Sequence, residues 1–230
     1  MGTPELGTPR PAWYALRPGR VRDWVTVLHP PYTLWHLSYV ALGAALAQHF
    51  HLNRLVAALV AFFLALGIAA HVLDELRGRP LRTRIPGPAL VAAAVVSLAG
   101  AVAIGIVAAA AWGYGLLVFV AVGAVLVPAY NLEWFGGRIH TDWGFALAWG
   151  AFPVLTAYFV EAQTIRVEAV IAAGYATAAS LMQRTLSTTA RRARRMHGAP
   201  AEAAAAERAL RLGSIAAVCI AAAAVAARLR

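Results

Sequence analysis

The chain has 230 residues, of which 61% are hydrophobic and only 13% are charged. Soluble domains average roughly 45–50% and about 25%, so this composition excludes an ordinary water-soluble protein, whose core could not hide so much apolar surface. All twenty basic residues are arginine and the formal net charge is +10; in so apolar a chain the charge indicates orientation in a membrane and contact with anionic lipid head groups, and we expect no nucleic acid as a partner.

Residues 1–31 are expected to be a cytoplasmic N-terminal segment. They contain several prolines and four arginines, Arg10, Arg17, Arg20 and Arg22. Because no apolar stretch leads the chain, no cleavable signal peptide is expected. Residues 32–230 are then predicted to form a single transmembrane helical domain.

Apolar stretches follow one another through the rest of the sequence. A helix that rises ~1.5 Å per residue needs ~20 apolar residues to cross ~30 Å of hydrocarbon. Charged residues, prolines and glycines separate candidate spans at 32–50, 54–74, 89–109, 112–131, 142–160, 167–186 and 211–228. The sequence therefore predicts an all-α polytopic membrane bundle of about seven transmembrane helices.

The connections between these spans differ in arginine content. Sixteen of the twenty arginines lie in the N-terminal segment and in the connections at 77–88, 131–141 and 184–211. The positive-inside rule places these connections in the cytoplasm. We therefore expect an integral protein of the cytoplasmic (plasma) membrane, with its N-terminus in the cytoplasm and, if there are seven spans, its C-terminus outside.

The second span ends in three polar residues that share one face of a helix. His71, Asp74 and Glu75 are spaced i, i+3 and i+4. Two carboxylates beside an imidazole suit a divalent cation. The other interpretation is an ordinary helix end with its polar groups in water.

Arginines follow this helix end at once, in "RGRPLRTRIP". Arg77, Arg82 and Arg84 suit a phosphate or diphosphate, because guanidinium groups make forked, charge-assisted hydrogen bonds. They would equally suit the head groups of the membrane. Both interpretations place this stretch at the cytoplasmic surface.

Three separate segments resemble the UbiA superfamily of intramembrane prenyltransferases. "LHPPYTLWHLSYVALGAAL" is similar to the first helix of that family, and "PAYNLEWFGGRIHTDWGFALAWGAFP" looks like the end of its fourth helix and its Gly-rich fifth helix. "AHVLDELRGRPLRTRIP" is similar to its aspartate-rich motif N-D-x-x-D-x-x-x-D with a basic tail, and Asp74 matches the middle aspartate. The resemblance extends from residue 28 to about residue 190.

The resemblance implies a lateral, lipid-open cavity in which magnesium ions hold an isoprenyl diphosphate. Ionisation of the diphosphate would give an allylic carbocation that an acceptor captures, and the metal would stabilise the charge of the leaving group. The candidate catalytic residues are Asp74, Glu75 and Tyr130. The candidates for binding an isoprenyl diphosphate or a related lipid are Arg77, Arg82, Arg84, Asn131, Arg138, Gln183 and Arg184.

The chain departs from the family pattern in its sixth span. The second aspartate-rich motif belongs there, yet "SLMQRTLSTTARRARR" contains no acid. Its arginines, at 184, 191, 192, 194 and 195, could bind a diphosphate directly or could contact anionic lipid. A non-catalytic lipid-binding or accessory membrane protein is therefore an alternative to the enzyme.

A membrane metalloenzyme is a further alternative. His71 takes the place of the first aspartate of the motif. If the two connections meet, a mixed site could form from His71, Asp74, Glu75, Glu133, His140 and Asp142. Such a site would suit Mn, Fe or Zn better than magnesium alone. His140 and Asp142 could instead belong to the start of a helix, and His36 is an ionisable group inside the first span.

Overall fold

The structure is a computed structural model that describes residues 12–17, 19–195 and 200–230. All regular elements in these residues are helices. They are α1 (Arg20–Val27), α2 (Pro30–Leu46), α3 (Leu52–Phe62), α4 (His71–Leu76), α5 (Gly87–Trp112), α6 (Leu116–Asn131), α7 (Asp142–Ala146), α8 (Phe152–Ala162), α9 (Val167–Arg195) and α10 (Pro200–Arg228). The π-helical segments η1 (Phe63–Ala70) and η3 (Leu147–Ala151) join α3 to α4 and α7 to α8, and η2 (Trp134–Gly137) is a 3-10 turn.

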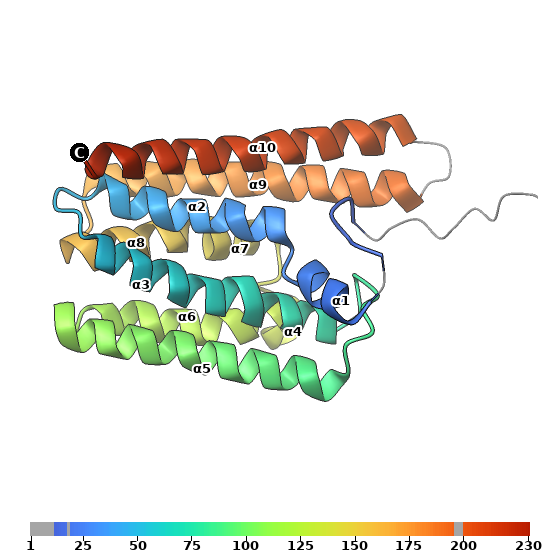
Figure 1. Ribbon diagram of the computed structural model, residues 1–230, viewed down its shortest axis with the longest axis horizontal. Coiled ribbons are helices and arrows are strands. Elements are labelled where there is room, and N and C mark those ends of the chain that lie inside the picture. The colour runs from blue at the N-terminus through green and yellow to red at the C-terminus, as the bar shows by residue number, and fades with distance from the viewer. Residues whose placement is uncertain (1–11, 18, 196–199) are drawn as a thin grey trace, which may run out of the picture.

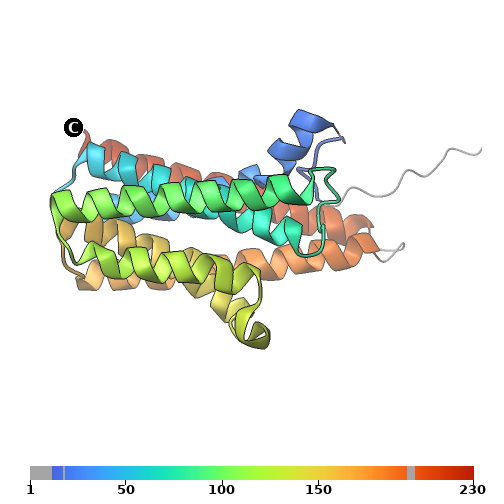
Figure 2. The ribbon, with the colours of Figure 1, turned by 90° about the horizontal axis from the view of Figure 1, so that it is seen from below.

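The described helices after α1 form seven rods that run back and forth along one axis (Figure 1). α9 and α10 lie at one edge of the bundle, α5 and α6 lie at the other, and α2 packs extensively against α8 and α10. Figure 2 shows the same rods from below, with the connection from α6 to α7 turned out from the side of the bundle. The prediction of an all-α fold is confirmed.

Four of the described helices are long and apolar enough to cross a membrane. They are Leu52–Leu76, Gly87–Trp112, Asp142–Ala162 and Pro200–Arg228. α2 and α6 have 17 and 16 residues, fewer than the ~20 that a full crossing needs. Several membrane-spanning helices are therefore supported, and seven crossings remain a prediction.

The connection predicted over residues 184–211 is mostly helical. α9 continues to Arg195 and α10 begins at Pro200, so all seven arginines expected in that connection lie on the two helices. Arginine and alanine are good helix formers, and positive charge is favourable in the last turn of a helix. Arg194 also bonds Glu207 across the two helices at 2.8 Å.

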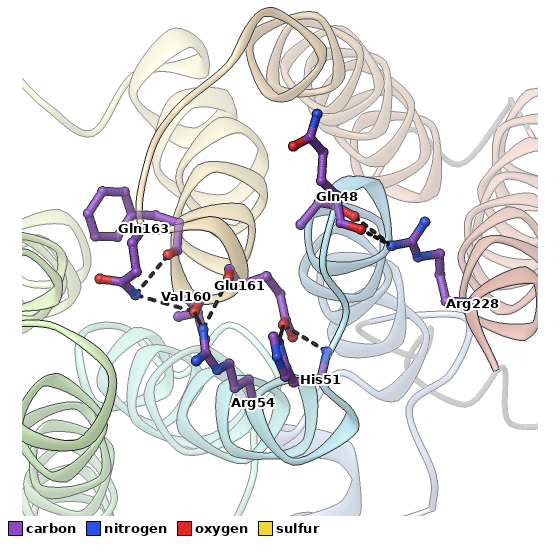
Figure 3. A network of polar contacts seen from close by, with 9 residues as sticks. Gln48, His51, Arg54, Val160, Glu161, Gln163 and Arg228 are labelled. Carbon is purple, nitrogen blue, oxygen red and sulfur yellow. Dashed lines mark hydrogen bonds and ion pairs between the residues drawn. The ribbon is translucent and has the colours of Figure 1, made fainter.

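Side chains from other elements cap the helix ends at the end of the bundle remote from α1 (Figure 3). Arg54 donates to the carbonyls of Val160 and Glu161, each at 3.0 Å. Arg228 donates to the last carbonyls after α2, and Glu161 accepts from the backbone and ring of His51. Orphan carbonyls at helix ends need such partners, so most of the polar groups here hold the bundle together.

Glycine allows the closest helix contacts. A Cβ atom on Gly43 of α2 would lie 2.3 Å from the carbonyl oxygen of Val154 in α8, whereas one on Gly174 of α9 would meet no atom within 4 Å. Small residues at such contacts let helix backbones approach each other in lipid.

We therefore expect Gly43→Ala to lower the thermal unfolding midpoint of the detergent-purified protein, because α2 and α8 must separate; overpacking of this kind costs about 1–3 kcal/mol. Gly174→Ala is the matched control and should be neutral or stabilising, since alanine favours helix. Equal midpoints for the two variants would contradict the close packing of α2 on α8.

Candidate functional site

A second group of polar side chains lies at the end of the bundle where α2 begins and α4 and α6 end. Several parts of the chain contribute to it: the lead before α1, the residue before α2, α2, α4, α6, the connection before α7, and α9. We call this group the polar cluster. Its members are Tyr14, His29, His36, His71, Asp74, Tyr130, His140, Gln183, Arg184 and Arg191.

The lead and α4 meet through two imidazole rings. The hydroxyl of Tyr14 lies 2.6 Å from Nδ1 of His29. The ring of His29 stacks on that of His71, with centroids 4.3 Å apart and planes 14° from parallel. Tyr14, His29 and His71 thus form one continuous chain of contacts, although they lie in three different parts of the sequence.

Backbone carbonyls fix the orientation of three imidazoles, those of His36, His71 and His140. Nδ1 of His71 lies 3.1 Å from the carbonyl oxygen of Gly67. Nδ1 of His36 lies 2.8 Å from that of Trp149, and Nδ1 of His140 lies 3.1 Å from that of Tyr130. A carbonyl oxygen only accepts, so each Nδ1 carries the proton and each neutral ring keeps a lone pair at Nε2. These imidazoles are therefore oriented as hydrogen-bond acceptors.

The π-helical segments supply two of these carbonyls. Gly67 lies in η1 and Trp149 lies in η3. A π-helical turn shifts the usual backbone pairing and is frequent at functional sites. The irregular turns in the two broken rods thus serve to hold His71 and His36.

Tyr130 lies under His140 at the end of α6. The two rings stack with centroids 4.5 Å apart, and Trp149 meets the edge of Tyr130 at 5.5 Å. Tyr130 is 3% exposed. Its ring is thereby fixed, while its hydroxyl remains available to a ligand.

Opposite charges face each other across the cluster. Half-buried Asp74 is within electrostatic reach of His140, Arg191 and Arg184, and it makes no side-chain hydrogen bond to the described residues. Arg184 is held by exposed Asp142 at 2.9 Å. The carboxylate of Asp74 and the guanidinium groups of Arg184 and Arg191 are therefore close enough to influence one another's charge.

Burial keeps the side chains of His29 and Tyr14 uncharged. The pKa of His29 is well below its ordinary value, because the ring is buried and because His71 and Arg191 add positive charge nearby. Burial, followed by the neighbouring Tyr32, raises the pKa of Tyr14 well above its usual range. Near neutral pH both side chains are neutral and bind by hydrogen bonding.

Three buried polar atoms of the cluster have no partner in the described residues. They are Nε2 of His29, Oη of Tyr130 and Oε1 of Gln183. Leaving such a group unpaired costs about 1–3 kcal/mol, and buried polar groups are normally satisfied. The three atoms belong to different elements of one cluster, which makes the cluster the candidate ligand site; Nε1 of Trp13 and Oε1 of Glu161, outside it, also lack a partner in the described residues.

Glu75, predicted to be catalytic and metal-binding, has a structural role. Its side chain is fully buried. Its carboxylate accepts from the backbone N–H of Leu81 and of Thr83 at 2.9 Å each, and from the hydroxyl of Thr83 at 2.8 Å. Glu75 thus shapes the loop that follows α4, while Asp74 faces the cluster.

The predicted phosphate-binding arginines near α4 lie mostly elsewhere. Arg77 bonds the carbonyl oxygen of Leu132 and the carboxylate of Glu133, at 2.6 and 2.7 Å. Arg82 and Arg84 are exposed on the loop, and Arg138 is exposed on the connection to α7. The amide of Asn131 turns back to the carbonyl oxygen of Val127.

The six predicted metal ligands do not gather in one site, although His71, Asp74 and His140 belong to the polar cluster. Within residues 12–17, 19–195 and 200–230, no group of three or more His, Cys, Asp or Glu side chains is arranged to hold a metal ion. The physical reason is that Glu75, Glu133 and Asp142 are already engaged by the loop, by Arg77 and by Arg184. Thr141 caps α7 by accepting from the N–H of Gly144 at 2.9 Å.

Tyr14 and His29 were not predicted from the sequence. Nothing local distinguishes Tyr14, whose partner is fifteen residues away. His29 precedes Pro30 and has a left-handed backbone, with φ at 46°. A histidine directly before a proline that opens a helix was the one signal that could have directed attention to it.

An apolar cavity of about 100 Å3 lies between α3, α5, α6 and α8. Its walls are small residues together with Phe62, Trp112, Phe119 and Phe152. The hydroxyl of Thr156, the polar side chain in the lining, is bonded to the carbonyl oxygen of Phe152. Such a cavity suits a hydrocarbon group.

No known protein family, curated protein or solved structure matches this chain.

We predict that Glu75→Gln loosens the loop at 77–86. The amide nitrogen of glutamine would face an N–H donor where the carboxylate now accepts, at a cost on the order of 1–3 kcal/mol. Hydrogen exchange at the amides of Leu81 and Thr83 should accelerate. Exposed Glu202→Gln is the control, and unchanged protection of both amides in Glu75→Gln would rule out this role.

Proposed function

We propose that the chain is a divergent UbiA-like membrane prenyltransferase, which transfers an isoprenyl group from a lipid diphosphate to an acceptor. The observation that carries the proposal is the polar cluster at one end of an apolar helical bundle. There, Asp74, Arg184 and Arg191 belong to the same cluster as buried polar atoms that have no partner among the described residues. An amphiphile with an anionic head and an apolar chain would satisfy both parts of this arrangement.

Asp74 fits the binding of a magnesium ion together with substrate. Mg²⁺ is commonly held by one or two carboxylates and by phosphate oxygens. Asp74 is the acid of the cluster whose oxygens are free of hydrogen bonds to the described residues. A bound ion would supply charge stabilisation for the leaving diphosphate.

The remaining roles belong to residues of α6 and α9. Arg184 and Arg191 would neutralise the diphosphate directly, which compensates for the absence of acids in the last turns of α9. The buried hydroxyl of Tyr130 would donate to the head group or to the acceptor. We further propose that this end of the bundle faces the cytoplasm, because the arginines of the chain are concentrated there.

The apolar cavity supports the same assignment. Its lining is almost wholly hydrocarbon, and three of the helices around it, α3, α5 and α8, belong to segments that are long and apolar enough to cross a membrane. We propose that it accepts part of a prenyl chain. The cost of exposing such a chain to water, ~0.8 kcal/mol per CH₂, would then favour binding from the lipid phase.

The experiment is to incubate detergent-purified protein with Mg²⁺ and radiolabelled prenyl diphosphates of several chain lengths, and to measure the release of diphosphate. Asp74→Asn should lower turnover roughly a hundredfold, as expected when a charge-stabilising group is removed. Glu202→Gln, which removes an exposed acid, is its control. Removing Mg²⁺ with a chelator should reproduce the loss.

A second pair of variants tests the arginines. Arg191→Gln should weaken binding of prenyl diphosphate by roughly tenfold, because Arg191, unlike Arg192, acts on the charges of Asp74 and Tyr130. Arg192→Gln removes the same charge from the next residue and should have little effect. If the protein shows neither turnover nor metal-dependent binding with any chain length, the enzyme is excluded.

A non-catalytic lipid-binding protein is the second candidate, and the acid-free end of α9 favours it. This candidate requires binding of prenyl diphosphate without turnover. Unchanged binding and unchanged cellular function in Asp74→Asn would then support it over catalysis.

A further inference from the structure

The ring of His29 is the part of the polar cluster whose chemistry can be taken furthest. Its Nδ1 is bonded to the hydroxyl of Tyr14 at 2.6 Å, and its Nε2 is buried without a partner in the described residues. The protonation of Nε2 therefore decides what a ligand would meet there.

The Tyr14 contact sets this protonation. Burial raises the pKa of Tyr14, so the phenol keeps its proton. The hydroxyl makes no other hydrogen bond within the described part of the chain, so we assign it as the donor to Nδ1. The neutral imidazole of His29 then carries its own proton at Nε2, unlike the rings of His36, His71 and His140.

A positive charge acts on this buried donor, and it cannot accept a hydrogen bond from it. Arg191 acts on His29 as a positive charge, and it lowers the pKa of His29 after burial and His71 have done so. Arg191 itself donates to the hydroxyl of Thr188 at 3.1 Å. An anionic oxygen would be a suitable partner for both groups, because it accepts from an N–H group and pairs with a guanidinium.

We infer that Nε2–H of His29 and the guanidinium of Arg191 together bind a phosphate group of the isoprenyl diphosphate. This inference rests on the proposed function, and it adds to the site a residue that lies outside the aspartate-rich segment. His29 is preorganised for this contact, because its ring is clamped between Tyr14 and His71 and Pro30 follows it directly.

The test uses two substitutions at the same position. Asparagine keeps a polar atom near the place of Nδ1 and suits the left-handed backbone at residue 29, where φ is 46°. It lacks any atom at the place of Nε2. Glutamine extends an amide N–H toward that place, so it should restore the contact.

Binding would be measured by calorimetry in detergent with two probes, inorganic pyrophosphate and a non-hydrolysable prenyl thiolodiphosphate. We expect His29→Asn to weaken both by roughly tenfold or more, and His29→Gln to remain within about threefold of wild type. The same loss with both probes would place the contact on the phosphate head. Thermal midpoints equal to that of wild type would show that the fold is intact.

The outcomes separate this inference from the proposed function. Wild-type affinity in His29→Asn, combined with weakened binding in Arg191→Gln, would overturn the role of His29 and leave the prenyltransferase proposal in place. If the wild type binds the prenyl probe but none of the three variants differs from it, the head group lies elsewhere and the inference fails. Absence of binding by the wild type would overturn both.

Discussion

Two imidazole–carbonyl hydrogen bonds determine the shape of the polar cluster. His71 bonds the carbonyl oxygen of Gly67 and His36 bonds that of Trp149. Both carbonyls belong to π-helical segments inside the long rods, where the shifted backbone pairing leaves groups available to side chains. The stacked His29 and the edge contact of Trp149 on Tyr130 follow from these two fixed points. A regular α-helix through either segment would remove the support of the cluster.

The two ends of the bundle use their polar groups differently. At the end shown in Figure 3, Arg54, Arg228 and Glu161 bond helix termini and a neighbouring histidine. At the other end, Asp74 and Arg191 leave capacity unused by the described residues. Charge that completes helix ends contributes to stability, whereas charge left free near buried donors is suited to a ligand. One carboxylate oxygen of Glu161 is also unpaired among the described residues, so the free carboxylate of Asp74 beside the unpaired His29 and Tyr130 is what makes the other end the candidate site.

The sequence predicted the class of fold well, because composition and the length of apolar runs depend on local residues. It placed His71, Asp74 and Glu75 on one face of a helix, but it did not predict that they would have different roles. Glu75 accepts hydrogen bonds from backbone N–H groups of a loop, and the path of that loop cannot be read from residue spacing. The cluster members Tyr14 and His29 were missed for the same reason: their contacts are tertiary. The length of α9 was underestimated because arginine was taken as a sign of loop, although it favours helix.

The proposed site would recognise an anion in two ways, through the charge of the arginines and through neutral donors. Many guanidinium groups at one end of the chain produce a field that concentrates anions of any type, as exposed Arg192 and Arg195 would. Such a field does not distinguish a diphosphate from a lipid head group. Selection must therefore come from neutral donors with a fixed direction, and the buried Nε2 of His29 and hydroxyl of Tyr130 are placed for that role. Long-range electrostatic attraction would bring anions to the polar cluster, and the fixed donors of His29 and Tyr130 would decide which head group binds.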